Sequence, residues 1–367
     1  MPLEWIIAAL AVIAAAASAF SWWGVRKLRR ERLPAPQINP ASIQTTGDRQ
    51  RVALILNPVK LGAGLAREQV EQACSDAGWD PPLVLETTVA EPGTTQAHQA
   101  VKEGYDVVLA AGGDGTVRAI APALVHSSAS LGLLPLGTGN LLARNLGIAV
   151  NDVPRSVRQA LHGAGRRIDM GRVELRNERT GVNGQHTFLV MGGVGLDAIV
   201  VAATRDALKK KLGWLAYSEA GMRSLPGKRQ RMTISIDGGA WQTRKVHSVL
   251  FANCGKLPGG ITFVPDGTID DGFLDVIITS PRSILGWLWV AAKIVFRHPG
   301  PIPVITYHQV KRVDVKVSEA TGTQLDGDTS GDVTSLSVEV VPGALMVRVP
   351  GRATGPSVGM FSSSTER

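Results

Sequence analysis

Uninterrupted apolar runs alternate with helix-like segments in the part of the chain that follows residue 48. The runs at Val52–Leu56, Leu83–Glu86, 107–111 and 131–136 have the length and the composition of strands. Helices are expected between and after these runs, at residues 65–77, 94–103, 117–124 and 141–146. Strands that carry apolar residues on both faces and alternate with helices indicate a parallel sheet covered on both sides. We therefore expect an α/β domain over residues 49–165.

The pattern changes after residue 165. Several later runs alternate apolar and polar residues, as Val-Asp-Val-Lys-Val does at 313–317, which is typical of an antiparallel sheet with one solvated face. We expect a β-rich, sandwich-like second domain over residues 166–350, with two helical insertions. Residues 351–367 are rich in Gly, Ser and Thr, and we expect a disordered tail there.

The chain begins with a segment of a different character. Residues 5–25 are 21 consecutive uncharged residues, which as a helix would be about 31 Å long, close to the thickness of a bilayer core. Five basic residues follow within residues 26–32, and positive charge favours the cytoplasmic side. The sequence thus predicts a single-pass N-terminal transmembrane helix in the cell membrane, with residues 1–33 as anchor and basic flank, 34–48 as linker, and the catalytic domains in the cytoplasm.

Net charge and cysteine content limit the kinds of ligand, membrane or metal partner that the chain can have. The net charge is +8 and the pI is about 9.7, and residues 1–33, with five basic and two acidic side chains, contribute +3. The remainder is mildly basic, which suits an anionic ligand or an anionic membrane surface better than extended nucleic acid. Cys74 and Cys254 lie in unrelated segments without metal-ligand spacing, and we expect two free thiols.

A glycine-rich loop is the strongest candidate for chemistry. Gly112-Gly113-Asp114-Gly115-Thr116 follows an apolar run and precedes a predicted helix. Glycines allow close approach of the backbone to a ligand, and the amides of a following helix N-terminus favour an anion such as phosphate. Asp114 would repel a bare phosphate, so its presence predicts a Mg²⁺ ion that bridges nucleotide oxygens. The alternative is a tight turn with an Asp cap.

Two further polar loops follow strands of the same predicted sheet. Asn57-Pro58 follows the first strand, Gly137-Thr138-Gly139-Asn140 follows the fourth, and Thr87 and Thr88 follow the second. Because ligands bind beyond the carboxyl ends of parallel strands, these loops belong to one rim. No Gly-Lys-Ser/Thr sequence follows the glycines, and the dinucleotide-binding G-x-G-x-x-G spacing is absent.

Together these loops resemble the catalytic domain shared by diacylglycerol kinases and sphingosine kinases. The resemblance rests on the loops at 57–58, 112–116 and 135–140 and on Ala-Arg-Asn-Leu-Gly at 143–147, and it extends from about residue 50 to about residue 350. It implies an ATP-binding domain at 49–165 and a lipid-substrate domain at 166–350. The residues that it assigns to the ATP site are Asn57, Pro58, Thr88, Gly112, Gly113, Asp114, Gly115, Thr116, Gly137, Thr138 and Asn140. Thr87 could take the place of Thr88.

One departure from the family lies beside the glycine loop. Family members usually have Asn-Glu two and three positions after the loop threonine, and this chain has Arg118-Ala119. Arg118 either pairs with phosphate or solvates a helix face.

An acidic turn at residues 265–272 is a second candidate site. Closely spaced carboxylates repel one another unless a cation or a proton lies between them. Members of the family that the chain resembles carry a similar segment, in some cases with a structural Mg²⁺. The resemblance implies Asp266 as a ligand of that ion, with Asp270 and Asp271 beside it. The alternative is ordinary Asx-turn chemistry.

Asp328, in Leu325-Asp326-Gly327-Asp328, is the candidate catalytic base. Asp114, as the residue that would hold the Mg²⁺ ion, is the second candidate catalytic residue. Phosphoryl transfer to an alcohol needs a group that orients the hydroxyl and takes its proton. The family usually has Glu at the position of Asp328, and Asp is shorter by one methylene, about 1.5 Å of reach. An acidic β-turn is the alternative.

The leading hypothesis is an ATP- and Mg²⁺-dependent kinase that phosphorylates a membrane lipid hydroxyl, with diacylglycerol as the default acceptor. A basic region with aromatics at 209–231 and an apolar stretch at 283–296 suit either a membrane surface or packing against the sheet. An NAD kinase-type enzyme and a non-catalytic nucleotide or lipid sensor are the alternatives. A homodimer stays open.

Overall fold

The computed structural model describes residues 49–195, 229–257, 261–262, 264, 267–280 and 305–351. The predicted linker at 34–48, the apolar stretch at 283–296, most of the basic region at 209–231 and all but the first residue of the predicted tail lie outside these residues.

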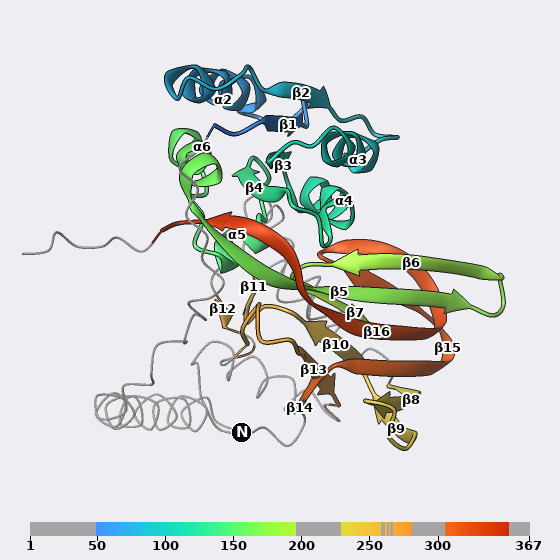
Figure 1. Cartoon of the computed structure of the whole chain (residues 1–367). Coiled ribbons are helices and arrows are strands. Elements are labelled where there is room, and N and C mark those ends of the chain that lie inside the picture. The colour runs from blue at the N-terminus through green and yellow to red at the C-terminus, as the bar shows by residue number, and fades with distance from the viewer. Residues whose placement is uncertain are drawn as a thin grey trace, which may run out of the picture. The chain divides into compact units, whose positions relative to one another are not determined.

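A four-stranded parallel sheet forms the first half of the described chain (Figure 1). Its strands are β1 (Val52–Leu56), β2 (Leu83–Glu86), β3 (Val107–Gly112) and β4 (Ser130–Pro135), in the order β4-β3-β1-β2. All three strand pairs are parallel. Every residue of β1 and β3 is buried, because helices cover both faces of the sheet.

Successive residues of the central strands pack into two different cores. Leu54 and Leu109 face the core formed with α2 (Ala63–Asp76) and α6 (Val153–His162). Ile55 and Val108 face the core formed with α3 (Thr94–Lys102), α4 (Asp114–Leu124) and α5 (Leu141–Asn145). The alternation follows from the two-residue period of a strand.

Antiparallel strands dominate the second half, and they bury a third core of Val, Ile, Leu, Phe and Met side chains. Their bounds are β5 (Ala164–Asn177), β6 (Val182–Phe188), β7 (Met191–Val194), β8 (Gln230–Ile236), β9 (Gln242–Val246), β10 (Ser248–Ala252), β11 (Lys256–Leu257), β12 (Ile261–Thr262), β13 (Leu274–Thr279), β14 (Ile305–Val310), β15 (Arg312–Leu325) and β16 (Asp328–Val349). β15 pairs with β16, β8 and β7, while β10 lies between β7 and β13. The α/β sheet followed by a β-rich part confirms this portion of the predicted fold class.

β16 joins the two halves into one sheet. It pairs antiparallel with β5 along most of its length, and near its end Met346 and Val347 pair in parallel with the start of β4. The sequence pattern predicts two strands here, at 335–340 and 344–349, separated at Pro342-Gly343. The structure has a single strand instead, because a register shift between Val341 and Leu345 absorbs the Pro-Gly pair as a bulge.

The predicted N-terminal transmembrane helix requires correction. No helix within the described residues is long and apolar enough to cross a membrane. The segment at 5–25 on which the prediction rests lies outside the described residues. We therefore withdraw the transmembrane helix, the membrane anchoring and the single-pass cell-membrane location.

Candidate active site

Three loops begin at the same edge of the parallel sheet, as the sequence predicts. The backbone N–H of Asn57, just past β1, donates to the carbonyl of Ala111 at the end of β3 over 2.9 Å. The N–H of Leu136, just past β4, donates to the carbonyl of Gly112 over 2.9 Å. These bonds continue the ladder beyond the strands, and they fix where each loop departs.

Glycines allow the loops after β3 and β4 to touch. A Cβ atom at Gly137 would lie 2.7 Å from the Cα atom of Gly113, and a Cβ atom at Gly112 would lie 2.4 Å from Oγ1 of Thr116. Real Cβ atoms do not come this close to other heavy atoms, so a side chain at Gly137 would force the two loops apart, and one at Gly112 would collide with Thr116 in the first turn of α4. The glycines therefore allow close backbone packing at the rim, where Gly112 is buried and Gly113 and Gly137 are half-buried.

The helix α4 begins inside the glycine loop. Asp114 is its first residue, Gly113 is its N-cap, and no side chain caps its first turn. The sequence predicts a helix from residue 117, so three residues of the predicted loop form the first turn instead. The exposed Gly115 and the buried Thr116 lie in this turn, whose amides point away from the helix body and favour an anion.

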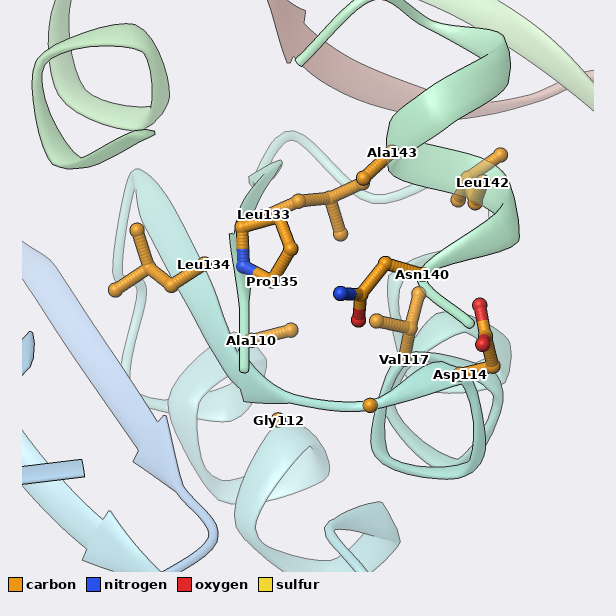
Figure 2. A pocket seen from close by; sticks show the side chains of 11 residues that line it. Ala110, Gly112, Asp114, Val117, Leu133, Leu134, Pro135, Asn140, Leu142 and Ala143 are labelled. Atoms are coloured by element: carbon orange, nitrogen blue, oxygen red, sulfur yellow. The ribbon is translucent and has the colours of Figure 1, made fainter. Parts of the chain in front are cut away.

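Asp114 connects the two glycine-containing loops. Its Oδ1 accepts a hydrogen bond from the backbone N–H of Leu141 over 2.6 Å, and a Cβ atom at Gly139 would lie 2.6 Å from its Oδ2. Burial raises the pKa of the Asp114 carboxyl, against the lowering effect of the backbone N–H groups near it. Asp114 thus holds the start of α5 against the first turn of α4 (Figure 2).

Asn140 shapes the second loop from within. Its backbone is left-handed, with φ 49°, and its side chain is buried. The side-chain Oδ1 accepts from the N–H of Gly137 over 3.1 Å, while Nδ2 donates to the carbonyl of Gly137 over 2.6 Å. Both bonds close the loop on itself, so the side chain acts on the loop's shape.

A cavity of about 10 Å³ lies between these loops and the sheet (Figure 2). It has room for roughly one water molecule, far less than a nucleotide needs. Its lining residues are Ala110, Gly112, Gly113, Asp114, Val117, Leu133, Leu134, Pro135, Asn140, Leu142 and Ala143. A nucleotide would therefore have to lie outside this cavity, along the rim of loops.

The remaining predicted rim residues differ in exposure. Pro58 and Thr138 are exposed, and Asn57 is half-buried, with its Oδ1 accepting from the N–H of Val59. Thr88 is exposed, and its hydroxyl accepts from the N–H of Glu91 in a local turn. Thr87 is buried, so Thr88 is the threonine that faces outward from this loop.

Asp328 reaches this rim from the second half of the chain. Its Oδ2 would lie 3.5 Å from a Cβ atom at Gly115, in the first turn of α4. Asp328 opens β16, directly after a hairpin turn in which Asp326 and Gly327 have φ values of 50° and 93°. Two positive φ values are typical of a type I′ turn, for which Asp-Gly is a favoured sequence. The tight turn sets the place where the Asp328 side chain emerges.

Comparisons with known proteins agree with this arrangement. The family model described as "Diacylglycerol kinase catalytic domain" matches residues 51–173, and the one described as "YegS C-terminal NAD kinase beta sandwich-like domain" matches residues 191–349. A diacylglycerol kinase of Bacillus subtilis is 30% identical over 288 residues, which are 77% of this chain and 91% of that protein. The chain belongs to the diacylglycerol kinase family. It is a lipid kinase, that is, a phosphotransferase, and the family implies the use of ATP.

Other relatives agree with this family. A probable lipid kinase YegS-like protein of Pseudomonas aeruginosa is 30% identical over 308 residues, which are 83% of this chain and 95% of that protein. A solved structure described as a putative diacylglycerol kinase from Bacillus anthracis str. Sterne superimposes with a TM-score of 0.63 at 21% identity, and the match covers 83% of this chain and 98% of that one. The structural likeness shows a shared fold.

The arginine that departs from the family pattern contacts the candidate base of this lipid kinase. Arg118 Nη2 lies 2.6 Å from Oδ2 of Asp328, and Arg118 Nη1 donates to the carbonyl of Leu325 over 2.6 Å. Neither of the two roles considered from the sequence, phosphate contact or solvation of a helix face, includes this ion pair.

Asp326 is a functional-site neighbour that the sequence analysis does not single out. Its carboxylate is buried and accepts hydrogen bonds from the backbone N–H groups of Leu189, Val190 and Met191, over 2.8 to 3.0 Å. Burial raises the pKa of Asp326 to about 6. The Asp-Gly hairpin signal could have located the turn, but nothing in the sequence indicates the three amides that the side chain binds.

The acidic turn makes contacts of its own. The Asp270 carboxylate accepts two hydrogen bonds from Arg166, each 2.9 Å long, and the Asp271 carboxylate accepts from Thr268 Oγ1 and from the N–H of Phe273. Asp266 lies outside the described residues. Within those residues no group of three or more His, Cys, Asp or Glu side chains is arranged to hold a metal ion. A structural Mg²⁺ at this turn stays a prediction.

Proposed function

We propose that this lipid kinase transfers the γ-phosphate of ATP to the hydroxyl of diacylglycerol, which gives phosphatidic acid. The rim suits a triphosphate because α4 begins there with no side chain capping its first turn, and Gly115 and Thr138 are exposed beside it. Residues 49–165 would bind the nucleotide, with Asn57, Pro58, Thr88, the loop at 112–116 and the loop at 137–140 around it. The Mg²⁺ ion would arrive with the nucleotide and supply charge neutralisation between its phosphates.

Asp328 would be the catalytic base. The acceptor hydroxyl loses its proton to the Asp328 carboxylate as its oxygen bonds to the γ-phosphorus, and the bond from that phosphorus to the β,γ-bridging oxygen breaks, so that ADP leaves. One observation carries this assignment: a carboxylate from the second half of the chain lies beside the first turn of the helix that follows the glycine loop. A base at this position can meet an acceptor held by residues 166–350.

The test is phosphate transfer by the full-length protein in vesicles that contain dioleoylglycerol, with labelled ATP and Mg²⁺. The wild type should give labelled phosphatidic acid, and Asp328→Asn should lower the rate by about 10²–10⁴-fold, the usual contribution of a general base. Asp332→Asn is the matched control, because Asp332 is an exposed carboxylate four residues further along β16. Full activity in Asp328→Asn would refute the assignment of the base.

A second acceptor class has a specific observation in its favour. The family description that matches residues 191–349 compares this part with an NAD kinase sandwich. The same assay should therefore include NAD and a total lipid extract. Label in NAD and none in lipid would favour the NAD kinase-type alternative, and nucleotide binding with no transfer would favour a sensor. The possible homodimer stays a prediction.

A further inference from the structure

Arg118 forms hydrogen bonds on both sides of the turn before β16. One guanidinium nitrogen donates to the Leu325 carbonyl, and the other forms the ion pair with Asp328, both over 2.6 Å. The planar guanidinium is suited to this task, because its donors are fixed relative to one another. One guanidinium group thereby binds both the Leu325 carbonyl and the Asp328 carboxylate.

The same turn is anchored from its other side. The buried Asp326 carboxylate accepts from three consecutive backbone N–H groups of the segment that leads into β7. That anchor fixes the turn within the β-rich half, whereas Arg118 projects from α4 of the nucleotide half. Arg118 is thus the contact through which the position of Asp328 depends on the helix that begins in the glycine loop.

The exposure of the pair indicates a role in orientation. The Asp328 side chain is 58% exposed and the Arg118 side chain 24%. Ion pairs with this much solvent contact contribute little to stability, because water screens the attraction. A free carboxylate at such a position can populate several rotamers, and the hydrogen bond from the guanidinium favours the one in which Oδ2 faces Arg118.

We propose that Arg118 is a positioning residue that holds Oδ2 of Asp328 so that Oδ1 can accept the proton of the lipid hydroxyl. Within the described part of the chain Oδ1 of Asp328 has no hydrogen-bond partner, whereas Oδ2 is bound by the arginine. The inference rests on the proposed function of Asp328. It predicts that loss of Arg118 affects the transfer step more than the binding of the nucleotide.

The first test compares Arg118→Ala and Arg118→Lys with wild type in the vesicle assay. A lysine carries one ammonium group and cannot reproduce the planar two-point grip. We expect kcat to fall by about 10–100-fold in Arg118→Ala, because misplacing a reacting group by about an ångström has effects of this size. KM for ATP should stay within about twofold of wild type, and Arg118→Lys should recover only part of the loss. Guanidinium chloride at a non-denaturing concentration should restore part of the rate of Arg118→Ala.

The matched control is Arg67→Ala, because Arg67 is an exposed arginine of α2 whose ion pair is with Glu71. Its kcat should equal that of wild type, and guanidinium should not raise it. Thermal unfolding of each variant shows whether the fold is retained.

The second test uses the Asp328→Glu background. If Arg118 acts through the carboxylate, the loss caused by Arg118→Ala should be smaller in that background than in wild type, because the longer side chain already changes the geometry. Equal losses in both backgrounds would overturn the inference, and so would a raised KM for ATP with unchanged kcat.

The inference and the proposed function fail in different ways. A wild type that labels no lipid, or an Asp328→Asn variant that keeps full activity, would defeat the proposed function. An active wild type with a dead Asp328→Asn variant and a fully active Arg118→Ala variant would defeat only the inference.

Discussion

The Oδ1 atom of Asp114 accepts a hydrogen bond from the backbone N–H of Leu141 over 2.6 Å, and this bond ties the glycine loop to the loop after β4. The sequence analysis assigns Asp114 to a bridging Mg²⁺. In the structure the carboxylate also has a task within the protein, since it orients a second loop of the same rim.

We expect Asp114→Ala to lower the free energy of unfolding by about 1–3 kcal/mol, because a part-buried N–H of Leu141 loses its acceptor. Asp114→Asn should have a smaller effect, since the amide oxygen can still accept this bond. Urea unfolding of both variants measures the difference. Equal losses would show that the negative charge matters more than the bond.

Gly137→Ala should weaken nucleotide binding. The added Cβ atom would lie 2.7 Å from Gly113 Cα and 2.9 Å from Oδ1 of Asn140, so the two loops must separate. The stability loss should be about 1–3 kcal/mol, as for other overpacked sites. Calorimetric titration with Mg²⁺ and a non-hydrolysable ATP analogue measures the affinity.

The control for this variant is Gly64→Ala. Gly64 lies within α2, and a Cβ atom there would meet nothing within 4 Å. Because Gly64 lies in the first turn of α2, an alanine there should change the free energy of unfolding by less than about 1 kcal/mol and leave the nucleotide affinity unchanged. Unchanged affinity in Gly137→Ala would show that the contact between the loops does not shape the nucleotide site.

Asp326 should make stability depend on pH in the mildly acidic range. Its pKa is about 6 in the folded protein and lies near 4 in an unfolded chain, so the folded state binds the proton more tightly. The contribution of this group to stability therefore rises as pH falls through about 6, and it levels off below about 4. The melting temperature of wild type minus that of Asp326→Asn should therefore increase as the pH falls from about 6 to about 4. A constant difference would contradict the prediction.

Asp270→Asn should lower the free energy of unfolding by about 1–3 kcal/mol, because Arg166 loses two charged hydrogen bonds. We expect the same loss in Mg²⁺ and in EDTA if the arginine is the only partner that the carboxylate needs. A wild type that Mg²⁺ stabilises, together with a larger loss for Asp270→Asn in Mg²⁺, would instead support the metal site that the sequence analysis predicts at Asp266, Asp270 and Asp271.

The local pattern of apolar and polar residues was sufficient to predict most helices and strands of the α/β half. The sequence prediction gives both ends of β1 and β2 to the residue, because β1 lies between Arg51 and Asn57, and β2 lies between Pro82 and Thr87. It misplaces the start of α4, since Gly113, Asp114 and Gly115 have low helix propensity in a helix interior but are tolerated at a helix N-terminus. It divides β16 because Pro-Gly is ordinarily a turn signal.

Only part of the candidate site was predictable, because some of its contacts join residues far apart in the chain. The rule that ligands bind at the carboxyl ends of parallel strands brings Asn57, Gly112 and Gly137 to one edge without further information. The ion pair of Arg118 and Asp328 joins residues 210 positions apart, and a single sequence carries no signal for such a contact. The amides bound by Asp326 are equally distant in the chain, 135 to 137 positions away.

The parallel pairing of β16 with β4 has a consequence for how the protein is made. The ribosome releases β4 more than 200 residues before Met346 and Val347, which pair with Ser130 and Leu131 at the start of its free edge. A nascent chain therefore carries an unpaired strand edge throughout most of its synthesis, and exposed edges of this kind pair readily with other chains. Premature termination shortly before residue 346 would leave that edge permanently bare, so a small C-terminal deletion should cause aggregation of the N-terminal half.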